Sequence, residues 1–196
     1  MTINPGKFGR GRHVALQLVL SIVALCAPGG TQATTLLRLS LAQMAQAADT
    51  IVRARCVTTA SRWDGGAIWT FAQVDVVESF KGSPPMRLQV RLPGGHVGHL
   101  ITNVEDAPRL QTGEEKILFL EKNVAGDYSV TGWVEGTFRI RKNLNGEETI
   151  TQDSSEVAVF DPATRQFRTE GLRNLSMSDF RQRVAAALAA GRAGFR

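Results

Sequence analysis

Cysteine is nearly absent from this chain, which has only Cys26 and Cys56 among 196 residues. Cys26 lies in a leader that we expect to be removed, so Cys56 would stand alone in the mature protein. A lone cysteine forms no intramolecular disulfide, which excludes a disulfide-stapled scaffold even in an oxidising compartment. Cys56 lies in a run rich in β-branched residues and is expected to be a small buried hydrophobe. The fold must therefore depend on its hydrophobic core.

Long hydrophobic runs are missing too, apart from one near the start of the chain. Three basic residues precede an apolar run at 14–26, and small residues follow it. The run is shorter than the roughly 20 residues that cross a bilayer core, so it is typical of a cleaved signal peptide rather than an anchor. The small residues predict cleavage between Ala33 and Thr34. We expect a signal peptide over 1–33 and one exported domain over 34–196, periplasmic or extracellular, with no membrane span.

Strong net charge is lacking once the leader is set aside. Three of the 23 basic residues lie in the leader, which leaves 20 basic against 18 acidic side chains. Residues 34–161 carry 13 basic and 16 acidic side chains, whereas 162–196 carry 7 and 2. A net acidic body in an exported protein argues against nucleic acid as the partner. The basic tail is expected to dock on its own domain.

Motifs for catalysis are sparse. No serine lies in a Gly-x-Ser-x-Gly elbow, and no glycine-rich segment leads into the Lys-Ser or Lys-Thr pair of a phosphate loop. His96 and His99 are spaced as His-x-x-His near Glu105 and Asp106, and imidazole with carboxylate suits zinc. Glycines around the histidines predict a mobile loop, and no glutamate lies between them to act as a base. We expect no metal or cofactor, and a hydrolase that uses this loop is the alternative.

The rest of the chain shows the patterns of β-strands. Leu88, Val90 and Leu92 alternate with polar residues, and the apolar burst at 116–120 is typical of a buried central strand. These patterns predict a mainly β fold, either an antiparallel barrel or a sandwich. Further strands are expected over 50–59, 68–79, 128–133, 137–142 and 148–152, with a last hairpin within 157–167.

Two helices are expected at the ends of this β domain. Ser40 and Ser176 each begin a capping box, which predicts a short N-terminal helix and a C-terminal amphipathic helix. The second helix should cover about 177–190 and end at Gly191, a residue common just after helix ends. Its apolar stripe is expected to pack on the β-strands.

Three connections carry more local expectations. Residues 96–112 have no strand pattern and are expected to be a mixed loop. The dipeptide Asn145-Gly146 predicts a two-residue type I′ hairpin turn, because both residues tolerate positive φ. The acidic pairs at 114–115 and 147–148 are expected to be solvated turn residues.

A resemblance adds to this pattern. Several motifs together resemble a family of uncharacterised exported bacterial proteins over about residues 40–140. These motifs are ADTIVRA at 48–54, SRW at 61–63, IWT at 68–70, FKG at 80–82, PGG at 93–95, GEEKILFL at 113–120 and GWVEGTF at 132–138.

The order of strands is also similar, more distantly, to the oligonucleotide/oligosaccharide-binding (OB) barrel of tissue inhibitors of metalloproteinases and netrin modules. This resemblance implies an OB-like barrel. Those inhibitors present an N-terminal cysteine to the protease zinc and staple the barrel with disulfides. Here the mature chain should begin at Thr34 and keeps only Cys56, so their mechanism is not implied.

The sequence thus predicts an exported, non-catalytic binding module, an inhibitor-like barrel that contacts another secreted protein. Binding of carbohydrate or another polyanion is a second alternative. Large aromatic residues near turns are either core lids or binding anchors. The interaction surface is expected around the loops at 63–66 and 93–99, and it comprises Trp63, Trp69, Pro93, Gly94, Gly95, His96 and Trp133.

Overall fold

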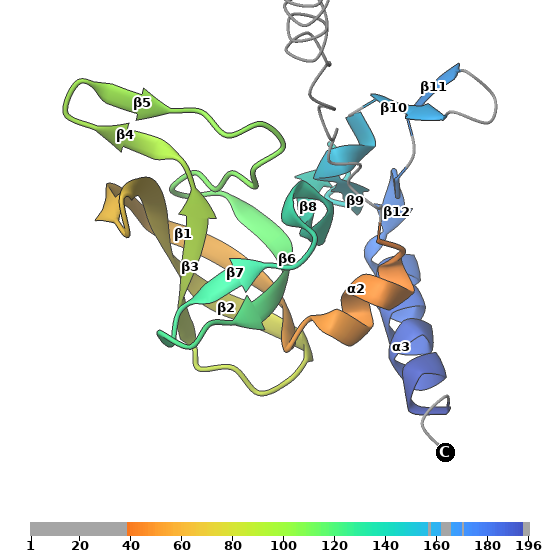
Figure 1. Ribbon diagram of the computed structural model, residues 1–196. Coiled ribbons are helices and arrows are strands. Elements are labelled where there is room, and N and C mark those ends of the chain that lie inside the picture. Colours follow the sequence, from red (N-terminus) through yellow and green to blue (C-terminus); the bar gives the residue numbers. More distant parts are fainter. Residues whose placement is uncertain (1–38, 157, 162–165, 170, 194–196) are drawn as a thin grey trace, which may run out of the picture. The chain divides into compact units, whose positions relative to one another are not determined.

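The computed structural model describes residues 39–156, 158–161, 166–169 and 171–193. All of them belong to one compact unit, Arg38–Arg196, shown as a coloured ribbon in Figure 1. The expected signal peptide, with Ala33 and Thr34, lies outside the described residues. No helix among the described residues has the length and apolar character that crossing a membrane requires.

The unit is mainly β, and its largest element is a mixed sheet with the strand order β1-β2-β3-β7-β6-β8-β9-β12. The strands of this sheet are β1 (Thr50–Asp64), β2 (Ala67–Lys81), β3 (Arg87–Pro93), β6 (Glu115–Lys122), β7 (Tyr128–Val130), β8 (Thr137–Lys142), β9 (Glu148–Gln152) and β12 (Leu175–Ser176). Two small hairpins stand apart: β4 (Gly95–Val97) with β5 (Leu100–Thr102), and β10 (Ala158–Asp161) with β11 (Gln166–Thr169). The hairpin expected within 157–167 is thereby confirmed.

Part of the large sheet is ringed. β1 pairs with β2 along one edge and with β6 along the other, so the pairings lead from β1 through β2, β3, β7 and β6 back to β1. An all-antiparallel arrangement was expected, but β3 and β7 pair in parallel through Val90 and Tyr128. The chain makes a long excursion through β4, β5 and β6 between these two strands, and such a connection permits parallel pairing.

One hydrophobic core lies on the inner side of these ringed strands. The predicted alternation in β3 is confirmed, because Leu88, Val90 and Leu92 are buried in this core. Val52 from β1 and Leu118 from β6 join them. Cys56 is a buried free thiol in the same core, and burial, together with nearby Glu114, raises its pKa. The thiol is therefore held in its unreactive protonated form.

A second core lies between the sheet and two helices, α2 (Leu41–Ala47) and α3 (Met177–Ala193). The Ser40 capping box at the start of α2 is confirmed, with reciprocal bonds to Gln43 of 3.2 and 2.8 Å. The expected stripe of α3 is also confirmed, because Phe180 and Val184 are buried and Leu188 packs against them. Figure 1 shows α2 and α3 side by side, next to β12.

Two local expectations were wrong. Gly191 does not end α3, and a side chain at this position would collide with the side chain of Gln46 on α2, so the glycine permits close helix packing. The Asn145-Gly146 turn is not type I′, because only Gly146 has positive φ, at 81°. The loop instead spans 143–147 and is closed by the Asn143 side chain, which accepts from the backbone N–H groups of Asn145 and Glu147 at 2.9 Å.

Candidate interaction surface and pockets

The β1–β2 hairpin ends in a tight turn. Asp64 pairs with Ala67, so Gly65 and Gly66 alone form the connection, with φ of 59° and 81°. Both residues have the positive φ that a two-residue hairpin turn needs, so the loop expected at 63–66 is a tight turn. Trp63 stands beside it with 54 % of its surface exposed. An aromatic side chain so exposed contributes little to the core.

The β4–β5 hairpin was not predicted, since residues 96–112 were expected to be a loop. β4 pairs with β5 through His96 and Ile101, and Gly98 with His99 makes the turn. Two of its apolar residues are largely exposed: Leu100 is 57 % exposed, and Ile101, which also lines the pocket described below, is 72 % exposed. Glycine and histidine interrupt the apolar alternation of this short segment, which hid the hairpin from sequence analysis.

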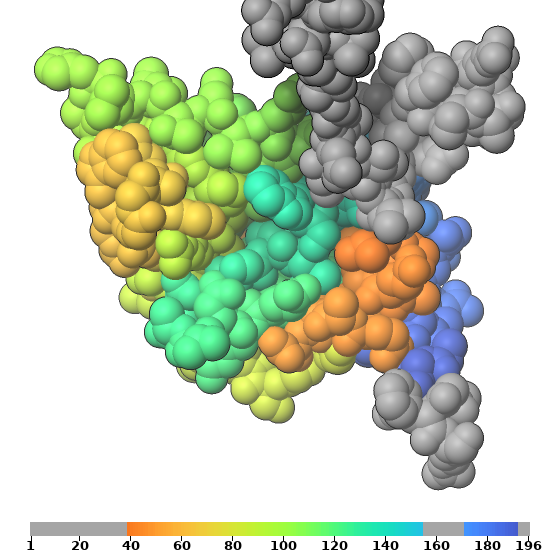
Figure 2. Space-filling model, viewed as in Figure 1, coloured from red at the N-terminus to blue at the C-terminus, as the bar shows by residue number. Residues whose placement is uncertain are grey.

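The two predicted loops lie at the same end of the sheet. Gly95 packs so closely on β1 and β2 that a Cβ atom there would collide with the side chains of Ser61 and Thr70. Figure 2 shows the gold β1–β2 turn and the green β4–β5 segment side by side. We call the exposed apolar side chains of these two hairpins, Trp63, Leu100 and Ile101, the tip surface.

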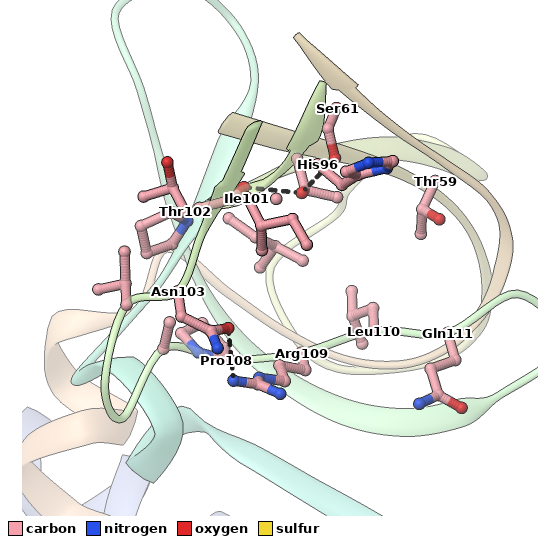
Figure 3. A pocket seen from close by; sticks show the side chains of 17 residues that line it. Thr59, Ser61, His96, Ile101, Thr102, Asn103, Pro108, Arg109, Leu110 and Gln111 are labelled. Carbon is pink, nitrogen blue, oxygen red and sulfur yellow. Dashed lines mark hydrogen bonds between the residues drawn. The ribbon is translucent and has the colours of Figure 1, made fainter. Parts of the chain in front are cut away.

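A pocket of about 340 Å³ lies beneath the β4–β5 hairpin (Figure 3). Ser61 and His96 lie at one end of this view, and Asn103 with Arg109 lies at the other. Thr70 Oγ1 donates to the Gly94 carbonyl at 2.8 Å and lies 2.9 Å from Ser61 Oγ. Because the single Thr70 proton is used in this way, Ser61 must donate to Thr70. These bonds fix the start of the hairpin and leave Ser61 without a base.

The structure separates the two histidines of the expected metal alternative. His96 lines the pocket from β4, whereas His99 lies in the hairpin turn, and both are exposed. Among the residues that the structure describes, no three or more His, Cys, Asp or Glu side chains are grouped to hold a metal ion. Within the same residues, His96 makes no hydrogen bond to Ser61.

The outward face of β2 and β3 carries aromatic rings covered by arginines. Phe71 lies under Arg62, with the guanidinium carbon 3.5 Å from the ring centroid. Trp69 lies under Arg91 at 4.0 Å. Arg91 also forms an ion pair with Asp64 at 3.0 Å. Cation–π stacking of this kind orders long side chains on an otherwise open sheet face.

Trp133 lies outside the sheet, although a strand was expected over 128–133. β7 ends at Val130, and Trp133 begins the 3-10 helix η1 (Trp133–Gly136). Its φ is 58°, a conformation that is rare for a large aromatic residue. The ring is 43 % exposed, so burial of the ring does not account for this conformation. Pro93, Trp69 and Trp133 do come together, around a smaller pocket that also contains Arg91.

A cluster of charges on β1, β6 and β9 was not predicted from the sequence. Arg53 makes two 2.8 Å bonds to Glu148 and a further bond to Glu115. The hydrogen bonds to Glu148 raise the pKa of Arg53, although burial opposes this. The bonds from Arg53 lower the pKa of Glu148, and bonds from Arg53 and Arg55 lower the pKa of Glu115 against the effect of its own burial. Glu115 and Glu148 are therefore structural residues, not solvated turn residues.

The chain was compared with protein-family models and with curated proteins. No protein-family model matches the chain, and no curated protein matches it. The fold and surface define a β-rich domain with a partly ringed sheet, two packed helices and an exposed apolar tip.

Proposed function

We propose that the ringed strands β1, β2, β3, β6 and β7 form a barrel of the OB type. The order β1-β2-β3-β7-β6-β1 supports this, because it joins the first strand to the fourth and the third strand to the fifth of the ring. The parallel pairing of β3 with β7 fits the same connectivity. A small barrel of this kind is filled by side chains, so its ligands contact the outer face and the loops.

We propose further that the protein is an exported, non-catalytic interaction module that contacts another exported protein. The observation that carries this proposal is the exposure of Trp63, Leu100 and Ile101 on two hairpins that lie at the same end of the sheet. Exposed apolar side chains that gather from separate segments are typical of interaction sites. Tryptophan is also enriched among residues that dominate binding energy.

The environment of the tip surface favours contact over catalysis. Ser61 donates its proton to Thr70, so it is not activated as a nucleophile. The pocket beneath the hairpin has an ordered wall of hydroxyl and amide groups, which can act as the polar rim of an interface. The short edge strand β5 has all three residues exposed and can accept a partner segment.

Quantitative capture from the native exported fraction tests this proposal. The double variant Trp63→Ser/Ile101→Ser should lose a specific protein that the unmodified chain retains. Leu144→Ser is the matched control, because Leu144 is equally apolar and fully exposed but lies in the β8–β9 loop. Retention of the same protein by the double variant would refute a contact through the tip surface.

A further inference from the structure

A second concave site lies apart from the tip surface. It is a pocket of about 180 Å³ between the outward face of β2–β3 and the segment from β7 to η1. Pockets for drug-sized ligands usually exceed 300 Å³, so this one suits a single ring of a larger ligand. Its lining includes Trp69, Arg91, Pro93, Pro108, Ser129 and Trp133.

Two tryptophans, Trp69 and Trp133, line this pocket. Trp133 is held at φ 58° directly after Gly132, which itself has φ 67°. A non-glycine residue in this region costs on the order of 1–3 kcal/mol, and such costs are concentrated at binding sites. Among the described residues, neither the Trp69 nor the Trp133 indole N–H has a hydrogen-bond acceptor. Two aromatic side chains, one of them partly covered by Arg91, thus line the same small pocket.

The charges beside the pocket are already balanced. Arg91 is paired with Asp64 at 3.0 Å, and Arg87 further along β3 is paired with Asp75 at 2.6 Å. The buried Arg91 Nε atom has no hydrogen-bond partner among the described residues and can donate to a ligand oxygen, whereas an organic cation would meet the guanidinium of Arg91. The face therefore complements an uncharged ligand that both donates and accepts hydrogen bonds.

We propose that this pocket binds one ring of a neutral saccharide. The apolar face of Trp133 packs against the C–H groups of the sugar ring, as large aromatic side chains do with flat apolar surfaces, and the part of Trp69 that Arg91 leaves uncovered borders the same ring. The indole N–H groups donate to sugar oxygens, and the half-exposed Asp64 carboxylate accepts from a hydroxyl. Gln73 and Gln89, bonded to each other at 2.9 Å, continue the polar strip along β2 and β3 for adjoining rings.

Titration calorimetry of the exported protein with maltotriose, cellotriose and chitotriose tests the site. Saturable binding of at least one of them is expected, with affinity about tenfold weaker in Trp133→Gly, a loss of about 1.4 kcal/mol. Glycine tolerates positive φ, so this variant should fold as well as the original, which thermal unfolding checks. Trp133→Phe should keep part of the affinity, and Leu144→Ser should keep all of it.

Several results would overturn the proposal. Absence of saturable binding to all three trisaccharides would do so, as would equal binding by Trp133→Gly. Binding of a proline-rich peptide in place of the sugars would assign the pocket to another ligand class. Because none of these variants alters Trp63, Leu100 or Ile101, failure here leaves the capture result at the tip surface unaffected.

Discussion

Two outward faces of the ringed strands contrast in what covers them. On β1 and β6, Ile51, Ile117 and Phe119 point outward and are fully buried under α2 and α3. On β2, Trp69 and Phe71 also point outward, but arginine side chains rather than a helix lie over them. Aromatic residues alone therefore do not distinguish a face covered by helices from an open face.

The covered face is held by interlocking aromatic rings. Phe180 of α3 lies 5.3 Å from Phe138 and 6.5 Å from Phe119, in edge-to-face arrangements. The open face has guanidinium groups in place of such rings. We therefore expect substitutions on the helix-covered face to affect stability most. We expect substitutions on the open face to affect binding instead.

The largest effect is expected from Phe180→Ala. This change removes a fully buried ring that contacts the sheet, and such truncations cost about 3–5 kcal/mol. Urea-induced unfolding followed by circular dichroism measures the loss. The matched change on the open face, Trp133→Ala, should cost less than about 1 kcal/mol because the ring is half-exposed. Equal losses of unfolding free energy in the two variants would contradict the proposed difference between the covered face and the open face.

A smaller effect is expected from Arg53→Met beside the covered face. The variant leaves Glu115 and Glu148 close together, each with a side chain only 18 % exposed, without their shared partner. Loss of one partner from a buried ion pair costs about 3–5 kcal/mol, and partial exposure should reduce this to about 2 kcal/mol. Chemical denaturation at neutral pH measures it. An unchanged unfolding free energy would show that the cluster contributes nothing.

The same cluster predicts how stability depends on pH. The pKa values of Glu115 and Glu148 are lower in the folded protein than in the unfolded chain. Their stabilisation is therefore complete above the unfolded glutamate pKa of about 4.3 and is lost as pH falls below it. Unfolding free energies measured from pH 7 to pH 3 should decline less steeply in Arg53→Met. Parallel curves for the two proteins would contradict this linkage.

The smallest effect on stability is expected from Ile101→Ser at the tip surface. Exposed substitutions away from special features usually change stability by less than about 0.5 kcal/mol. The melting temperature should therefore match that of the unmodified protein. A large decrease would show that the β4–β5 hairpin supports the core instead of serving contact.

Local signals in the sequence predicted most of the strands and both helices. The alternation in β3 and the Ser40 capping box each depend on neighbouring residues, and each was confirmed. The loop at 143–147 failed because the Asn143 side chain offered a competing set of hydrogen bonds.

Contacts between residues far apart in the sequence could not be predicted from such local signals. Arg53, Glu115 and Glu148 come from three strands, and no local pattern shows that their side chains meet. The pocket between Trp69 and Trp133 likewise depends on β7 ending early and on the unusual backbone of Trp133. Sequence analysis named both tryptophans as part of one surface, but their juxtaposition is a property of the fold.

Amide hydrogen exchange on the captured complex and on the free protein is the most direct test of the account. Contact through the tip surface predicts added protection at residues 61–66 and 95–102, with little change in α3. Added protection confined to α2 and α3, with the β4–β5 hairpin exchanging as in the free protein, would contradict the account.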